Sequence, residues 1–434
     1  MRMYDIIAKK RDGMELSREE LEFFVNGSLG DIPDYQLSAL LMAICIRGMS
    51  EREISELTLL MAHSGDMMDL TRIDGVTVDK HSTGGVGDKT TLIAGPIAAA
   101  CGVKVAKMSG RGLGFTGGTI DKLEAIPGFR TSLTNIEFFD IVNYAGICVV
   151  GQTSNLAPAD KKLYALRDVT ATVDSMPLIA SSVMSKKLAA GSDCILLDVK
   201  AGRGAFMKTR ERALELARLM VAIGRRAGRR TAALITDMDA PLGRAIGNSL
   251  EVVEAVETLS GKGPADITEL CLELAANMIA LASKEKSASL EESRSRAEEA
   301  LKSGAALRKF ENMVRAQGGD VSYLRDTGLF PAAAASGEYI SGQEGYIHGI
   351  DAEGCGITAS LLGAGRERAG DPVDPAAGIL LLRKPGDYIR RGEPLAILYG
   401  SNEMRLVQGL ARMARCYEIS SEKPQQGEIV LARV

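Results

Sequence analysis

From Gly75 onward, short stretches rich in β-forming residues alternate with stretches of helical periodicity. The β-rich stretches read GVTVDKHS, KVAKMSG, GICVVGQ, CILLDVKAG and RTAALITDM. Strands that alternate with helices are typical of βα units, because a crossover helix must return the chain to the start of the next parallel strand. We therefore predict an α/β domain with a mainly parallel sheet over residues 75–154 and 194–330.

The first sixty residues carry only helical signals. Ser17-x-x-Glu20 and Ser50-x-x-Glu53 are capping boxes, each followed by apolar residues at helical spacing. The same periodicity predicts a helix over residues 34–47, where a glycine follows. The chain therefore begins with a small helical unit.

Residues 160–190 are helical again, with the stretches KKLYALRD and PLIASSVMSKKLAAG. If this segment returns to the first helices, the helical domain is discontinuous and comprises residues 1–65 plus 159–190. A stretch rich in Glu, Ser and Ala over residues 283–309 predicts a solvated surface helix.

After about Gly337 the composition shifts to glycine-rich β-structure, which predicts a C-terminal β-rich subdomain over residues 338–434. Its segment AAGILLLRKPGDYIRRGEPLAILYG resembles half of a biotinyl/lipoyl hammerhead. A carrier protein using Lys384 is therefore an alternative. We favour a structural lysine, because Lys384 lies in a strand-to-turn stretch whereas a carrier lysine lies at a hairpin tip. The predicted fold class is thus α/β plus all-α, with a hammerhead-like third part.

The amino-acid composition limits the kinds of molecule that the protein is expected to bind. The 434 residues are 46% hydrophobic and 25% charged, and the net charge is −4 with bases and acids interleaved. This pattern argues against nucleic acid, since phosphate-backbone binding needs a concentrated basic face. We expect no secretory signal, because residues 1–10 carry charges within an amphipathic pattern and lack an apolar core. We expect no membrane span, because the longest apolar run, residues 92–103, is short and broken by glycine and proline. The seven cysteines are dispersed without C-x-x-C spacing, which is typical of a reduced, cytoplasmic protein without zinc.

The stretch KHSTGGVGDKTT, residues 80–91, follows the first predicted strand and leads into a predicted helix. Backbone N–H groups of a glycine-rich turn and of a helix N-terminus favour an anion. Lys80 and Ser82 add a positive charge and a hydroxyl, and His81 adds a titratable ring. The stretch therefore predicts a phosphate site beside a proton donor.

The stretch KMSGRGLGFTGGTIDKLE repeats this arrangement after the next predicted strand. Because parallel strands end at the same edge of a sheet, the two loops are expected to converge on one crevice. Among its polar residues we assign Ser109 and Thr119 to the ligand and leave Thr116 unassigned. Arg111 and Asp121 are expected to pair and brace the loop.

Four long motifs resemble those of the thymidine and pyrimidine-nucleoside phosphorylases. They are KHSTGGVGD, SGRGLGFTGGTIDKLE, GQTSNLAPADKKLYALRDVTATVDS and SSVMSKKLAAG, in the same order as in that family. The similarity extends over essentially the whole chain. It implies reversible cleavage of pyrimidine nucleosides (uridine, deoxyuridine or thymidine) by inorganic phosphate, giving the free base and a (2-deoxy)ribose 1-phosphate without an organic cofactor.

The resemblance also implies roles for individual residues. Phosphate is expected at Lys80, Ser82, Thr91, Lys107, Ser109 and Thr119. The base is expected at Tyr164, Arg167, Ser182 and Lys186, and His81 is the expected acid. Some family members bind a structural potassium ion, at the positions of Gly87, Lys89, Leu242, Ala245 and Glu254.

The chemistry of glycosidic cleavage agrees with these roles. Negative charge develops on the leaving pyrimidine, where Arg167 and Lys186 would stabilise it. His81, with an ordinary pKa of about 6.5, can donate a hydrogen bond or a proton to a ring carbonyl. Ser182 and Lys186 are four residues apart, so they share one helix face, whereas we expect Lys187 to be a solvated surface charge. No covalent intermediate is needed, which predicts inversion at the anomeric carbon.

The division into domains implies motion. The expected base ligands lie in the helical unit and the phosphate loops in the α/β unit, so catalysis requires domain closure. We expect the connections at residues 64–75, 151–158 and 191–194 to act as hinges. The resemblance further implies a homodimer formed through the N-terminal helices.

Two residues depart from the family pattern, and two alternatives remain open. Phe115 stands where histidine is common, and it can tune specificity or simply pack; Arg203 stands where a small residue is usual. The pair Lys107-Met108 favours broad pyrimidine-nucleoside specificity over strict thymidine specificity.

The alternatives are a strict thymidine phosphorylase and an anthranilate-type phosphoribosyltransferase, although neither loop supplies the acidic cluster that a magnesium-bound pyrophosphate needs.

Overall fold

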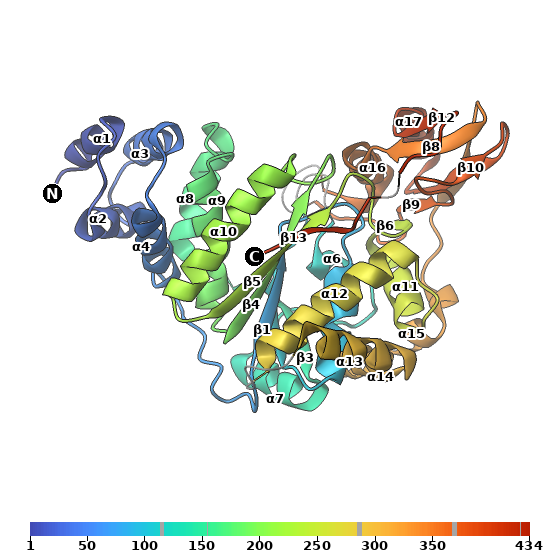
Figure 1. Ribbon diagram of the computed structural model, residues 1–434, viewed down its shortest axis with the longest axis horizontal. Coiled ribbons are helices and arrows are strands. Elements are labelled where there is room, and N and C mark those ends of the chain that lie inside the picture. Colours follow the sequence, from blue (N-terminus) through green and yellow to red (C-terminus); the bar gives the residue numbers. More distant parts are fainter. Residues whose placement is uncertain (113–116, 154, 284–288, 367–370, 426) are drawn as a thin grey trace.

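A computed structural model describes residues 1–112, 117–153, 155–283, 289–366, 371–425 and 427–434. Six helices form a unit at one end of the molecule, seen in blue and green at the left of Figure 1. They are α1 Met3–Arg11, α2 Arg18–Ser28, α3 Asp34–Arg47, α4 Glu51–Ala62, α8 Pro158–Val169 and α9 Met176–Ala189. Leu163 of α8 and Leu178 of α9 share a buried core with Phe24 of α2 and Leu40 of α3. Residues distant in the sequence therefore build one helical body.

The expected capping boxes are present and explain where two helices begin. The Ser17 hydroxyl accepts from the Glu20 N–H and the Ser50 hydroxyl from the Glu53 N–H, while each glutamate accepts from the backbone of its serine. Helix α3 has the predicted bounds. Helix α4 ends at Ala62, and His63 caps it.

The central α/β unit is built around a mainly parallel sheet. Its main strands are β1 Val78–Ser82, β2 Val105–Ser109, β3 Ile147–Gly151, β4 Cys194–Ala201 and β5 Arg230–Asp237. Strands β1, β4 and β5 pair in parallel in that order, and β2 pairs in parallel with β3. A parallel bridge between Thr77 and Lys104 joins β1 to β2. All five predicted strands are confirmed, and their carboxyl ends meet at one edge.

Helices cover this sheet. In Figure 1, α10 lies along one side of β4 and β5 and α12 along the other. The solvated helix predicted over residues 283–309 corresponds to two helices, α13 and α14. Residues 284–288 lie outside the described part. The helices and short elements of this unit are α5 Thr90–Ala100, α6 Thr119–Glu124, α7 Asn135–Ala145, α10 Arg210–Arg226, β6 Ala245–Gly247, α11 Asn248–Leu259, α12 Ala265–Ala282, α13 Leu290–Lys302, α14 Ala305–Ala316, α15 Ser322–Arg325 and η1 Thr327–Leu329.

A β-rich subdomain lies at the end of the molecule opposite to α1–α4, in orange and red in Figure 1. It contains two antiparallel sheets, in the orders β6-β9-β11-β7 and β10-β8-β12. Its elements are β7 Ala335–Ile340, β8 Gly345–Ile350, α16 Ala352–Ala359, η2 Ser360–Ala364, β9 Gly378–Leu381, β10 Tyr388–Ile389, β11 Pro394–Gly400, α17 Glu403–Met413 and β12 Tyr417–Ser420.

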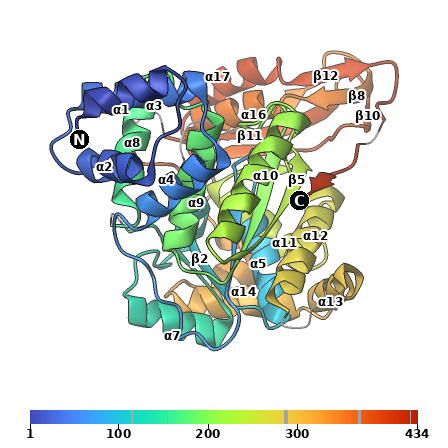
Figure 2. The same ribbon diagram turned by 60° about the vertical axis from the view of Figure 1, so that its left-hand side comes forward.

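Two strand pairings join the parts in a way that the sequence did not predict. Strand β13, Val430–Arg433, leaves the β-rich subdomain and pairs antiparallel with β5 of the central sheet. Strand β6 of the α/β unit pairs with β9 of the subdomain. Figure 2 shows β13 beside β5 near the end marked C. Among the described residues, no helix is long and apolar enough to cross a bilayer.

Lys384, considered above as a carrier lysine, fastens the subdomain to the α/β unit. Its ammonium donates to the carbonyl oxygens of Pro241 and, at 2.8 Å, of Gly243. It also lies 3.0 Å from a carboxylate oxygen of Asp266. These contacts support the structural interpretation of Lys384.

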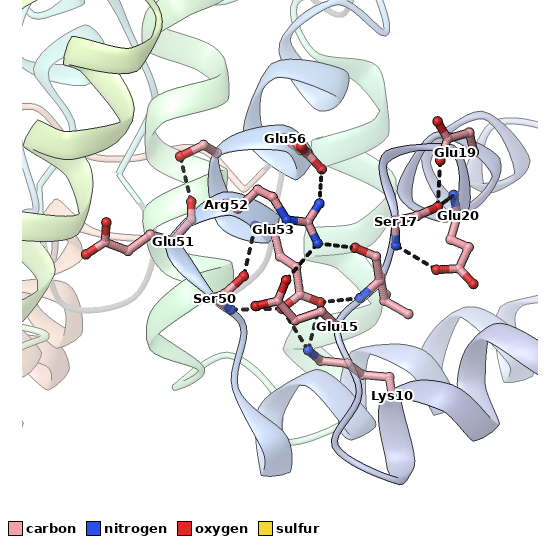
Figure 3. A network of polar contacts seen from close by, with 12 residues as sticks. Lys10, Glu15, Ser17, Glu19, Glu20, Ser50, Glu51, Arg52, Glu53 and Glu56 are labelled. Atoms are coloured by element: carbon pink, nitrogen blue, oxygen red, sulfur yellow. Dashed lines mark hydrogen bonds and ion pairs between the residues drawn. The ribbon is translucent and has the colours of Figure 1, made fainter.

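The helical unit contains a buried ion pair that holds three segments together (Figure 3). The Glu53 carboxylate accepts from the Lys10 ammonium at 2.8 and 3.0 Å, from the Leu16 N–H at 2.8 Å and from the Ser50 N–H at 2.8 Å. Glu53 is fully buried and Lys10 is nearly so. One carboxylate thus ties α1 and the α1–α2 connection to the start of α4.

We predict that Glu53→Ala lowers the free energy of unfolding of the helical unit by about 3–5 kcal/mol, because it leaves the Lys10 charge buried without a partner. Chemical denaturation followed by circular dichroism measures the loss. Glu56→Ala is the matched control, since Glu56 pairs with Arg52 one turn further along the helix at 2.8 Å in a more exposed position. The Glu56→Ala control should lower the free energy of unfolding by no more than about 0.5 kcal/mol. Equal losses in the two variants would contradict this account.

Candidate active site

The first glycine loop leaves the carboxyl end of β1, where Lys80 is buried in a network of charges. The Lys80 ammonium lies 3.1 Å from a carboxylate oxygen of Asp198 on β4. The ammonium of Lys200, on the same strand, lies 2.8 Å from the same oxygen. The Thr236 hydroxyl donates to the other oxygen of Asp198 at 2.7 Å. One buried carboxylate is therefore shared between two lysines.

Asp79, next to Lys80 in the sequence, is shared in the same way. It lies 3.3 Å from the ammonium of Lys107 on β2 and 2.8 Å from that of Lys187 on α9. Our expectation that Lys187 is a solvated surface charge is wrong, since the side chain is 3% exposed and also donates to the Met108 carbonyl at 3.2 Å. The reason is the packing of α9 against the sheet, which turns Lys187 toward β1 and β2.

These shared carboxylates leave positive charge in excess at the carboxyl ends of β1 and β2. Burial, opposed by Asp79 and aided by Lys187, lowers the pKa of Lys107 to about 7. Burial raises the pKa of the Asp79 carboxyl, but Lys107 and Lys187 outweigh it and the net shift is downward. A dianion placed here would meet an unbalanced positive potential in a region shielded from water.

Hydroxyl groups line the same edge. Asp88, in the first glycine loop, accepts from the hydroxyls of Ser82 and Thr90, and Thr90 in turn accepts from Lys80. The adjacent Thr91 lies in the first turn of α5. Burial raises the pKa of Asp88, but the surrounding lysines, Lys80 first among them, hold it well below its usual value. Asp88 orients hydroxyls, a role that sequence reasoning missed.

The second loop begins at the same edge of the sheet. Ser109 is the last residue of β2, and Thr119 is the first residue of α6. The predicted brace is confirmed, since Arg111 lies 3.2 Å from Asp121. Arg366 from the β-rich subdomain pairs with the same carboxylate at 2.8 Å. Phe115 and Thr116 lie outside the described residues.

His81 lies next to the end of β1, among four lysines. Its Nε2 atom is buried and has no hydrogen-bond partner within the described part of the chain. Burial and then the charges of Lys187, Lys107, Lys80 and Lys186 hold the pKa of His81 well below its usual value. The ring is therefore neutral near pH 7. A neutral imidazole can donate a hydrogen bond from one nitrogen, but it holds no extra proton to transfer.

A second group of polar side chains lies on the facing helices α8 and α9. The Lys186 ammonium donates to the Asp160 carboxylate at 2.6 Å and to the Ser182 hydroxyl at 3.2 Å. The predicted common face of Ser182 and Lys186 is confirmed by this contact. Asp160, at the start of α8, was missed because a lone aspartate in a helical stretch has no distinguishing pattern.

Arg167 of α8 is buried and shapes the connection between the two helices. Its guanidinium donates to the carbonyls of Thr172 at 3.3 Å, Val173 at 2.8 Å and Leu178 at 3.0 Å. It lies over the Tyr164 ring, 5.7 Å from the centroid. A guanidinium has five N–H donors, so two remain for a ligand beside Tyr164.

The five residues expected at a potassium site also come together. The Lys89 ammonium donates to the carbonyls of Leu242 at 3.0 Å and Ala245 at 2.9 Å, and it pairs closely with Glu254. Gly87 packs against the same two carbonyls. Among the described residues there is no group of three His, Cys, Asp or Glu side chains that could hold a metal ion.

Arg203, the second departure from the family pattern, contacts the β-rich subdomain. Its guanidinium pairs with Glu418 of β12 at 2.7 Å, and its N–H donates to the Asp239 carboxylate at 2.8 Å. Both charged side chains are about half exposed, so the pair contributes little to stability. Arg203 therefore forms a contact between the α/β unit and the β-rich subdomain.

Comparisons with known proteins agree with this arrangement. Residues 4–65 match the helical bundle domain of a glycosyl transferase family, residues 74–307 match the a/b domain of that family, and residues 346–420 match the pyrimidine nucleoside phosphorylase C-terminal domain. The chain is 57% identical over 404 residues to the pyrimidine-nucleoside phosphorylase of Geobacillus stearothermophilus, with 93% of each chain covered. It is 56% identical to that of Bacillus subtilis and 54% identical to that of Staphylococcus haemolyticus, over the same share of each chain.

The chain belongs to the pyrimidine-nucleoside phosphorylase family. Family membership confirms the resemblance and the fold class inferred from the sequence motifs. The architecture also resembles the anthranilate phosphoribosyltransferase of Thermus thermophilus, with a TM-score of 0.57 and 20% identity over 72% of this chain and 98% of that one. At that identity, the likeness to the phosphoribosyltransferase concerns the fold alone.

We predict that His81 titrates in phosphate-free buffer with a pKa well below the usual value of about 6.5, because burial and the neighbouring lysines disfavour the charged ring. The folded pKa lies below the unfolded one, so the unfolded chain binds a proton first as the pH falls below about 6.5. His81 therefore lowers stability progressively on acidification. Histidine ring proton shifts in NMR spectra measure the titration, and the spectrum of His81→Asn assigns the signal. A signal from His81 that titrates at pH 6.5 or above would refute this account.

Proposed function

We propose that the protein catalyses the reversible phosphorolysis of pyrimidine nucleosides (uridine, deoxyuridine and thymidine) to the free base and a (2-deoxy)-α-D-ribose 1-phosphate. The observation that carries the proposal is the position of two adjacent lysines. Lys187 reaches Asp79 beside the phosphate loops, while Lys186 reaches Asp160 and Ser182 between α8 and α9. The proposed anion site and the proposed base site would thus adjoin at two consecutive residues of α9. Family membership supports the assignment.

Phosphate is the proposed co-substrate, and no organic cofactor is required. The excess of lysines over carboxylates suits a dianion, which gains most from charge-assisted hydrogen bonds in a region of low dielectric. Burial and then the charges of Lys187 and Lys80 lower the pKa of Lys107, and a bound dianion would oppose this shift. The proposed phosphate ligands are Lys80, Ser82, Thr91, Lys107, Ser109 and Thr119.

The base would lie between α8 and α9, held by Tyr164, Arg167, Ser182 and Lys186. As the glycosidic bond lengthens, the sugar becomes cationic and the pyrimidine anionic, and Arg167 and Lys186 would stabilise the pyrimidine charge. His81 would act as acid by donating a hydrogen bond from its neutral ring. Phosphate would attack the opposite face of the sugar, with inversion.

We expect broad specificity among uridine, deoxyuridine and thymidine, with strict thymidine specificity as the alternative. Purified protein mixed with uridine, and separately with thymidine, should release base only when phosphate is present. Absorbance of the free base measures the rate, and the ratio of the two rates gives the specificity. Release without phosphate, or no release from either nucleoside, would contradict the proposed function.

Lys186→Met provides the residue-level part of this experiment, because it removes the charge that faces the leaving base. We expect kcat/KM to fall by about 10²–10³, the effect of removing one charge-stabilising donor. Lys162→Met is the matched control, since Lys162 lies on the same helical unit but pairs with Asp34 at 2.7 Å on an exposed face. An equal loss in both variants would remove Lys186 from the proposed site.

We also infer a homodimer in the cytoplasm. Three large side chains of the N-terminal helices are 70–73% exposed: Tyr4, Tyr35 and Ile46. Such exposed apolar side chains suit a contact between two copies of the chain. All seven cysteines are free thiols, which suits a reducing compartment.

Domain closure is the proposed motion, and the connections between the units have distinctive contacts. The Asp66 N–H donates to the Asn155 carbonyl at 3.0 Å, and the Met68 N–H to the Ala189 carbonyl at 2.8 Å. The segments 64–75 and 151–158 therefore lie side by side, and Gly191 of the third segment packs against Met68 of the first. Gly191 has a φ of +84°, and an added Cβ would lie 2.2 Å from the Met68 carbonyl oxygen.

We predict that Gly191→Ala lowers kcat severalfold while phosphate binding, measured calorimetrically without nucleoside, changes less than twofold. The methyl group would force the Gly191 and Met68 segments apart at the amino end of the sheet, where Cys194 pairs with Val78, whereas Lys80 and Ser82 lie toward the carboxyl end of β1. Gly228→Ala is the control, because Gly228 has a similar φ of +73° and no atom within 4 Å of an added Cβ. It carries the same backbone cost of about 1 kcal/mol without the clash. A control that loses as much kcat as Gly191→Ala would exclude the hinge explanation.

A further inference from the structure

Lys89 follows the first glycine loop and is fully buried at the start of α5. Its ammonium has three oxygen partners: the carbonyl of Leu242 at 3.0 Å, the carbonyl of Ala245 at 2.9 Å, and a carboxylate oxygen of Glu254. A lysine ammonium has three N–H donors. All three donors of Lys89 are therefore satisfied by oxygens that come from a distant part of the chain.

The oxygen cage around this ammonium is fixed from outside. The second carboxylate oxygen of Glu254 accepts from the N–H of Arg244 at 2.7 Å and from that of Ala245 at 3.1 Å. The Leu242 N–H donates to the Val86 carbonyl at 3.0 Å. The carboxylate and the two carbonyls thus keep their places without help from the cation itself.

Two glycines close the cage so tightly that it holds one cation. An added Cβ at Gly87 would lie 2.4 Å from the Leu242 carbonyl oxygen. An added Cβ at Gly243 would lie 2.2 Å from a Glu254 oxygen and 3.0 Å from the Lys89 ammonium. The Leu242 carbonyl and the Glu254 carboxylate therefore lie against the two glycines, and a side chain at either glycine has no room.

These residues do not fit an additional potassium ion. The oxygens at Leu242, Ala245 and Glu254 are the ones that the resemblance assigns to potassium, and here the Lys89 ammonium bonds to each of them. A second cation sharing these oxygens would lie against a buried positive charge, where repulsion is weakly screened. The oxygens can serve the lysine or an ion, but they cannot serve both.

We propose that the Lys89 ammonium takes the place of a bound monovalent cation, so that this protein folds and functions independently of potassium. Covalent attachment gives the cage a permanent cation whose binding does not depend on salt composition. Lys89 is a positioning residue, since it joins the phosphate loop to the 242–245 segment without contacting the proposed substrates. Its effect on catalysis, unlike its effect on stability, rests on the proposed function.

The experiment compares melting temperatures in potassium, sodium and tetramethylammonium chlorides at equal ionic strength. The wild-type melting temperature should agree among the three salts within about 1 °C. Lys89→Thr removes the ammonium and leaves a hydroxyl oxygen beside the cage. This variant should melt about 4 °C higher in potassium than in tetramethylammonium, because an ion that binds only the folded state stabilises it. Phosphorolysis rates should follow the same order of salts.

Lys384→Thr is the matched control, because the Lys384 ammonium donates to two other carbonyls of the same segment, those of Pro241 and Gly243. It should melt at a lower temperature than the wild type by the same amount in every salt. A Lys89→Thr protein that folds only in potassium supports the proposal, and one with no salt preference overturns it. The melting temperature is measured without nucleoside, so a failure of this proposal can be distinguished from a failure of the proposed function.

A crystal of the wild-type protein grown in rubidium chloride gives an independent test. Rubidium stands in for potassium and is located by its anomalous scattering. We expect no rubidium peak within the cage of Leu242, Ala245 and Glu254. A peak there, or a wild-type melting temperature that rises saturably with potassium but not with sodium, would overturn the proposal.

Discussion

The sharing of two buried carboxylates among four lysines is the interaction on which the rest of the candidate site depends. Asp79 serves Lys107 and Lys187, and Asp198 serves Lys80 and Lys200. Each buried charge is costly to remove from water, and even when the neighbouring Asp88 is included, the carboxylates are fewer than the ammonium groups. The remaining positive charge favours an anion and keeps the neighbouring His81 ring neutral. The electrostatics of the site thus follow from a deficit of negative charge in the fold.

The same pairs hold the molecule together. Lys107 comes from β2, Asp79 from β1 and Lys187 from α9, so one group of charges joins two strands to a helix of the other unit. The neighbouring Lys186 turns the opposite way, toward α8. On a helix, adjacent residues point about 100° apart, and this rotation assigns one lysine to each side of the proposed reaction.

The sequence was sufficient to predict those elements whose signal lies within a few neighbouring residues. Capping boxes at Ser17 and Ser50 marked the starts of helices, and the five β-rich stretches became the five main strands of the central sheet. It was insufficient where the outcome depends on distant segments. Lys187 looked solvated because only the packing of α9 on the sheet buries it. The lowered pKa of His81 depends on lysines from β1, β2 and α9, and no pattern within β1 encodes that. Asp79 and Asp198 are single aspartates inside strands, which no spacing rule marks as partners of lysines.

The pairing of β13 with β5 has a consequence for how the protein is made. Residues 430–433 complete the central sheet next to a strand that ends at Asp237. About two hundred residues, including the whole β-rich subdomain, must therefore leave the ribosome after β5 before that strand gains its last neighbour. Until then the β5 edge offers unpaired backbone groups to any strand nearby. At synthesis rates of about 5–20 residues per second, the nascent chain exposes this edge for about ten seconds or longer, during which β5 is open to incorrect strand pairing.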